Sequence, residues 1–180
     1  MQSKQNPVGT FVLALLVGSA AMPALGDDAC EGFKWDVSKE RALFAESAVP
    51  LAAGKDRMSA PMVVPNRLYQ LQLTPQDHVA FVTPPAKKML TDGAYAGIAV
   101  LKIPASGSYR VSVDVPFWID VVSDGALVKA KDFQGQRGCS SPHKIVEFEL
   151  AGAQPFVVQL SGATADSVRL TITPSPMRKP

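Results

Sequence analysis

Alternating apolar and polar residues occupy the centre of the chain and predict β-strands. Between residues 109 and 150, apolar side chains recur at every second position of three segments, at Tyr109, Val111, Val113, Val115, Phe117, Ile119, Val121, Val146, Phe148 and Leu150. A strand with one buried face produces this period of two, because its successive side chains point to opposite faces. Pro116 interrupts the alternation, and Ser123-Asp124-Gly125 supplies turn residues after Val121.

Further strands are predicted on both sides of this region. The same alternation occurs at residues 69–73, 156–160 and 168–172, and residues 78–83 form a compact apolar run. Residues 96–103 are apolar enough for a strand that is buried on both faces. Eight or nine short strands with turn residues between them are typical of a sandwich or jelly roll. The predicted fold is therefore all-β, an antiparallel β-sandwich or jelly roll with one short N-terminal helix.

That helix is predicted over residues 37–46. Asp36 is a candidate N-cap, because its side-chain oxygen can accept hydrogen bonds from the first free amides of a helix. We expect Phe33, Trp35 and Phe44 to form the contact between this segment and the rest of the domain.

The first 26 residues have the composition of a secretory signal peptide. Lys4 is their only charged side chain, an apolar run spans residues 11–17, and small residues precede Asp27, which we take as the mature N-terminus. The apolar run is too short for a membrane anchor, which needs about 20 apolar residues. We therefore predict a periplasmic or secreted protein with no membrane span after cleavage.

The mature chain is long enough for one domain. Residues 27–66 are expected to be the helix and an irregular segment packed on the sandwich, residues 67–173 the β-sandwich, and residues 174–180 a proline-rich flexible tail. The formal net charge is only +2, and the charges are scattered. This pattern provides no electrostatic surface for nucleic acid or for an anionic membrane.

Two cysteines, Cys30 and Cys139, are predicted to form a disulfide in an oxidising compartment. The alternative is a reactive or metal-binding pair. That alternative has little support in the sequence, which contains neither a CxxC motif nor a local cluster of histidine and cysteine.

Three segments together resemble a family of short, largely uncharacterised exported proteins of proteobacteria. They are CEGFKWDVSKERALFA at residues 30–45, GAYAGIAVLKIPASGSYRVSVDVPFWIDVV at 93–122 and DFQGQRGCSSPHKIVEFEL at 132–150. Some members of that family carry the label homogentisate 1,2-dioxygenase. The second half, with GSYRVSV, WIDVV and VVQLSG, is also similar to bacterial pre-peptidase C-terminal β-sandwich domains. Those domains are accessory or binding modules, often attached to secreted enzymes.

The dioxygenase label implies an open iron site of two histidines and a carboxylate. His78 and His143 are the only histidines, so both would have to be ligands beside Asp77, Glu147 or Glu149. The sequence has no GxSxG, HExxH, CxxCH or phosphate-binding glycine motif. We therefore expect no cofactor and no bound metal, and a binding or accessory module without catalytic activity. The alternative is a small metal-dependent enzyme or a periplasmic metal-binding protein that uses the two histidines.

Glu147 and Glu149 lie two residues apart, so both side chains project from the same face of a predicted strand. We interpret this face as a solvated outer face of a sheet, which limits aggregation. Paired carboxylates about 5 to 9.5 Å apart can also serve glycoside hydrolysis.

The candidate binding residues are Trp118, Asp120 and His143. If the alternating apolar residues face the core, Trp118 and Asp120 share the outer face of their strand. An indole beside a carboxylate offers a stacking surface and a hydrogen-bond acceptor, which suits an envelope glycan or a protein partner. The competing hypothesis is that the N-terminal segment covers Trp118, with Phe33 or Trp35 packed against it.

Overall fold

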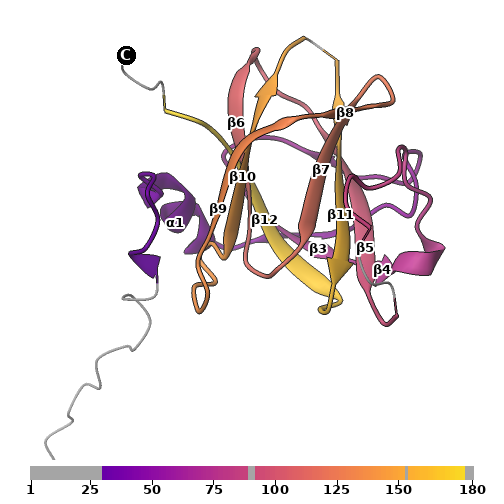
Figure 1. The fold of residues 1–180 in the computed structure, drawn as a ribbon, viewed down its shortest axis with the longest axis horizontal. Helices are drawn as coiled ribbons and strands as arrows, with labels where there is room; N and C mark the ends of the chain where they lie inside the picture. Colours follow the sequence, from indigo (N-terminus) through magenta and orange to yellow (C-terminus); the bar gives the residue numbers. More distant parts are fainter. Residues whose placement is uncertain (1–29, 89–91, 153, 177–180) are drawn as a thin grey trace, which may run out of the picture.

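A computed structural model describes residues 30–88, 92–152 and 154–176 of the chain. These residues form two β-sheets packed face to face, with one short helix beside the first sheet (Figure 1). The sequence prediction of an all-β, sandwich-like fold is confirmed. The predicted signal peptide and Asp27 lie outside the described residues, and so do residues 177–180 of the predicted tail.

The first sheet has six strands, in the order β1 (Val49–Ala52), β3 (Leu68–Gln72), β12 (Ser167–Pro174), β6 (Gly107–Val113), β10 (Lys144–Leu150) and β9 (Ala130–Gly135). The second sheet follows the order β2 (Met62–Val63), β5 (Tyr95–Leu101), β11 (Phe156–Ala163), β7 (Trp118–Ser123) and β8 (Ala126–Val128), and β4 (Thr74–Pro75) also pairs with β5. Asp124 and Gly125 connect β7 to β8 with φ angles of 49° and 78°. A tight hairpin turn requires such positive values.

The sheets are mixed, and the prediction of purely antiparallel pairing is wrong at two places. β1 pairs with β3 in parallel, and β2 pairs with β5 in parallel. Both exceptional strands come from the segment that was expected to be irregular. This segment adds β1 to the edge of the first sheet and β2 to the edge of the second before the chain returns to β3. Parallel neighbours need such a long connection, because a hairpin can join only antiparallel strands.

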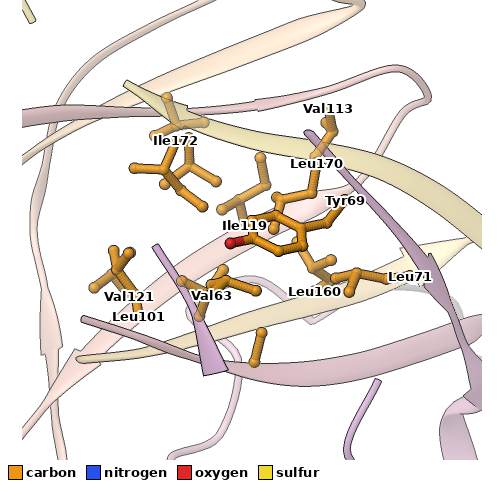
Figure 2. Close-up of a cluster of buried hydrophobic side chains, with 14 of the residues drawn as sticks. Val63, Tyr69, Leu71, Leu101, Val113, Ile119, Val121, Leu160, Leu170 and Ile172 are labelled. Carbon is orange, nitrogen blue, oxygen red and sulfur yellow. The ribbon is translucent and has the colours of Figure 1, made fainter. Parts of the chain in front are cut away.

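The core between the sheets is built from the alternating positions. Ile119 and Val121 of β7 lie among the buried side chains, together with Leu160 of β11 and Leu170 of β12 (Figure 2). The inward direction of Ile119 and Val121 confirms the predicted phase of this strand. Trp118, next to Ile119 in the chain, therefore belongs to the opposite face of its sheet.

The N-terminal segment covers the outer face of the first sheet. It contains α1 (Ser38–Phe44), which packs against β12. Asp36 Oδ1 accepts a 2.9 Å hydrogen bond from the Ser38 amide, but the N-cap position is Val37, so the predicted N-cap at Asp36 is wrong by one residue. Cys30 is disulfide-bonded to Cys139, which confirms the predicted pairing. Because the segment lies on the sheet, Glu147 of β10 is buried, and the prediction that it is solvated is wrong.

The outer face of the second sheet is also covered, by the loop that follows η2 (Gln76–His78). Residues 78–83 therefore do not form the predicted strand. Val79 and Val82 of this loop instead pack against a buried patch on the sheet. The Gln159 side chain holds the backbone of this loop on the sheet. Its Oε1 accepts a hydrogen bond from the Val82 amide at 2.8 Å, and its Nε2 donates one to the Thr83 carbonyl at 2.9 Å.

The last strand extends slightly beyond the predicted end of the sandwich. β12 includes Pro174, and the Ser175 amide donates a 2.9 Å hydrogen bond to the Ser108 carbonyl. Within the described residues, no helix has the length and apolar character needed to cross a membrane.

Candidate binding groove

An apolar groove of about 380 Å³ opens along the side of the sandwich where β8 and β9 form the edges of the two sheets. Its walls come from the second sheet through Trp118, Ile119, Asp120, Leu127 and Val128, and from the first sheet through Ala130, Phe133, Lys144, Val146 and Phe148. Lys129, the single residue between β8 and β9, also lines it, together with Ala86 from the loop. The groove thus lies between the sheet edges, beside the predicted Trp118 site.

The groove exists because β8 is shorter than its neighbour. β8 pairs only with residues 121–123 of β7, so it ends at Val128 before it reaches the first half of that strand. The chain then passes through Lys129 into β9 of the other sheet. The part of β7 from Trp118 to Asp120 therefore has no β8 neighbour, and a space remains where a longer strand would close the sandwich.

Trp118 and Asp120 are brought together, as their spacing predicted. The Trp118 Nε1 donates to Asp120 Oδ1 at 3.0 Å, and the Ala86 amide donates to Asp120 Oδ2 at 3.1 Å. The carboxylate is only 6% exposed. Burial raises the pKa of Asp120, against the opposing effect of these two hydrogen bonds. Both carboxylate oxygens are thus already hydrogen-bonded, and the indole N–H is used within the pair.

Two lysines lie against the Trp118 ring. The Lys87 Nζ is 5.5 Å from the ring centroid and the Lys144 Nζ is 5.2 Å from it, within the range of cation–π attraction. Lys144 also donates a 2.7 Å hydrogen bond from Nζ to the Phe117 carbonyl. Burial lowers the pKa of Lys144, the positive charge of Lys87 lowers it further, and Asp120 opposes both effects.

The competing hypothesis placed Phe33 or Trp35 of the N-terminal segment on Trp118, and for Trp35 it is wrong. Trp35 instead stacks on Arg110 of β6 in the other sheet, with the guanidinium carbon 4.6 Å from the ring centroid. Trp118 is only partly buried, and the loop residues around Ala86 lie beside it. Part of the site is thus supplied by Ala86 and Lys87, in the loop that follows the wrongly predicted strand at residues 78–83.

His143, the third predicted binding residue, makes a different contact. Its Nδ1 lies 3.3 Å from the Cys139 carbonyl, and its backbone amide donates to the Val113 carbonyl at 2.8 Å. Its neighbour Lys144 reaches the Trp118 ring instead. The contacts of His143 therefore hold the backbone just before β10. The next residue, Lys144, is the one that lines the groove.

The two histidines are not joined in a ligand cluster. His78 is exposed, with its Nε2 3.8 Å from the Asp77 carboxylate, and His143 contacts the Cys139 backbone. In the parts of the chain that the structure describes, no group of three or more His, Cys, Asp or Glu side chains could hold a metal ion. The structure thus adds no ligand set to the alternative of a metal site at the two histidines.

Phe133 is the groove residue that the sequence patterns missed most clearly. It lies opposite Val146 in the β9–β10 ladder, so the two side chains share the inner face of the first sheet. Phe133 lines the open groove and remains 68% exposed. Its isolation within the polar stretch at residues 129–138 was the available signal.

Comparison with known proteins leaves the function to be argued from this geometry. No family model matches the chain, and a search of curated proteins finds no match either. The resemblances that were inferred from sequence segments therefore stay predictions.

Proposed function

We propose that the protein is an exported binding module without catalytic activity, and that the groove beside Trp118 is its ligand site. The observation that carries the proposal is the open apolar groove between the sheet edges. It exposes Phe133 by 68% and Leu127 by 37%, although both are large apolar side chains. A concave apolar surface with a few polar groups at its margin is the usual form of a small-molecule site.

The cellular location is part of this proposal. The Cys30–Cys139 disulfide supports a periplasmic or secreted location, because such bonds persist in oxidising compartments. The signal-peptide composition of residues 1–26 supports export as well. N-terminal sequencing of the exported protein tests it, with Asp27 as the expected first residue. Retention of residues 1–26 would contradict export with cleavage.

The polar groups of the groove favour a ligand with an apolar body over a glycan. Sugar recognition depends on free hydrogen-bonding groups around an aromatic ring. Here the Trp118 N–H already donates a hydrogen bond to the Asp120 carboxylate, and this carboxylate accepts a second hydrogen bond from the Ala86 amide. The indole face and the apolar walls remain as the contact surface for a ligand.

A neutral hydrophobic dye tests whether the groove binds ligands. We expect Nile red to bind one site per chain, with the fluorescence increase that follows transfer to an apolar environment. The variants Phe133→Ala and Leu127→Ala should weaken binding, because they remove apolar walls. Met58→Ala is the matched control, since Met58 is 95% exposed and does not line the groove. If the two groove variants bound Nile red as tightly as Met58→Ala does, the proposed site would be contradicted.

A further inference from the structure

We infer that the groove takes an alkyl carboxylate, with its hydrocarbon chain between the sheet edges and its carboxylate beside the lysines at Trp118. This inference rests on the proposed function, because it names the ligand class of the same site. It follows from two features of the groove, the sign of the charge at one end and the apolar character of the walls.

The charged side chains in and beside the groove are mostly lysines. Lys129 and Lys144 line the groove, and the Lys87 ammonium approaches the same indole as the Lys144 ammonium. Asp120 is the one acidic side chain among the described groove-lining residues, and both of its oxygens already accept hydrogen bonds. A ligand anion would offset the repulsion between the lysines, whereas a ligand cation would add to it.

The ammonium groups of Lys87 and Lys144 both lie within 5.5 Å of the Trp118 ring centroid. The positive charge of Lys87 is one of the causes that lower the pKa of Lys144, after burial. An anion near the two ammonium groups would favour their charged forms. Ligand charge and groove charge are thus complementary, which gives both affinity and selectivity.

The rest of the groove suits a hydrocarbon chain. Beyond the lysines its walls are side chains such as Ile119, Val128, Phe133, Val146 and Phe148. The volume of about 380 Å³ lies at the small end of the usual range for ligand sites, roughly 300 to 1,000 Å³. We therefore expect one alkyl chain of short or medium length in the groove.

Titration with a homologous series tests the hydrocarbon part. In a Trp35→Phe background, Trp118 is the remaining tryptophan and reports directly on the groove. Hexanoate, octanoate and decanoate are added below their micellar concentrations, with calorimetry as a second readout. Each methylene should tighten binding by about fourfold until the groove is full, which corresponds to about 0.8 kcal/mol per buried methylene.

Ligands of equal length and different charge test the anionic part. Octanoate should bind more tightly than octanol, and octanol more tightly than octylammonium. Lys87→Ala and Lys129→Ala should each weaken octanoate binding by about twofold to fivefold, the usual range for exposed charge pairs, and should weaken octanol binding less than octanoate binding. Lys39→Ala on α1 is the matched control, because Lys39 is exposed and does not line the groove.

The outcomes separate this inference from the proposed function. Equal affinity for octanol and octanoate, with no effect of the lysine variants, would overturn the inference and leave an apolar binding site. Absence of binding by Nile red, octanol and octanoate alike would overturn both. Binding to phosphatidylglycerol vesicles without binding of free octanoate would also overturn the inference, because the anion would then be a lipid headgroup at a membrane surface.

Discussion

Replacing Arg110 with alanine should lower the free energy of unfolding by about 3 to 5 kcal/mol, the cost of removing one partner from a buried ion pair. Arg110 lies under the N-terminal segment and is only 6% exposed. Its guanidinium is 3.4 Å from the Glu147 carboxylate and 3.6 Å from the Glu40 carboxylate. Without it, two carboxylates that are each 2% exposed would share a site with no buried cation between them.

Two further contacts would be lost with the guanidinium, whereas other contacts of the two carboxylates would remain. Arg110 donates a 2.8 Å hydrogen bond to the Asp36 carbonyl and stacks on Trp35, and both contacts hold the N-terminal segment to β6. The hydroxyl groups of Thr173 and Ser175 still donate to the carboxylates of Glu40 and Glu147. These remaining bonds moderate the loss, which is why the expected value does not exceed the range for breaking one buried pair.

Urea denaturation of the oxidised protein at neutral pH measures this effect, with Trp35 fluorescence as a reporter beside the network. The denaturant slope shows whether the extent of unfolding changes between variants. Lys131→Ala is the comparison, because Lys131 is 44% exposed in its side chain and pairs with the exposed Glu149 at 3.0 Å, and with the buried Glu147 only at the longer distance of 4.0 Å. Such pairs contribute about 0 to 1 kcal/mol.

A loss below about 1 kcal/mol for Arg110→Ala, equal to that of Lys131→Ala, would refute the argument that buried charge makes this site sensitive. A variant that removes all three buried charges together tests the same argument. The triple variant Glu40→Gln, Arg110→Met, Glu147→Gln should be more stable than Arg110→Ala, because no uncompensated buried charge remains in it.

Three other changes have expected outcomes that stability measurements check. Replacing Cys30 and Cys139 by alanine should cost about 4 to 5 kcal/mol, as expected for a closed loop of about 100 residues, and a loss under about 1 kcal/mol would contradict the constraint. Burial raises the pKa of Asp120, so its contribution to stability is present below the ordinary value of 3.8 and is lost as the pH rises through the folded-state pKa. The free energy of unfolding of the wild type minus that of Asp120→Asn should therefore fall as the pH rises from about 3.5 to 7, and a flat difference would count against this cause. Trp118→Ala should cost about 1 to 2 kcal/mol, because the ring is only partly buried, whereas Phe156→Ala in the core should cost about 3 to 5 kcal/mol. Equal losses would show that Trp118 supports the fold rather than a site.

Local patterns predicted the central strands but not what covers them. The alternation at residues 109–113 identified β6 because the inner face of that strand packs on the opposite sheet. The solvated face that was predicted for Glu147 and Glu149 holds for Glu149 and is wrong for Glu147. Glu147 and Gln159 are both buried, by segments that are more than 70 residues away in the chain. A pattern within one strand carries no information about such distant coverage.

The sequence predicted that Trp118 and Asp120 would lie together, but it did not predict the shape of the groove beside them. Trp118 and Asp120 share a face because they lie two residues apart in one strand. The groove depends on the early end of β8 at Val128 and on the side chain of Phe133, whose direction follows only from the β9–β10 register. These are properties of the pairing between strands, which residue periodicity does not specify.

The placement of the N-terminal segment determines the order in which the chain can complete its fold. This segment is synthesised before the strands that it covers, and its partners are spread over most of the chain. The Lys34 amide donates a hydrogen bond to the Gln134 side chain, and Glu40 accepts one from Thr173 in the last strand. Cys30 forms the disulfide with Cys139. It can therefore dock only after nearly the whole chain is available, and until then the buried charges on the outer face of the first sheet remain in water. Contacts over such long sequence separations place the protein among slowly folding topologies.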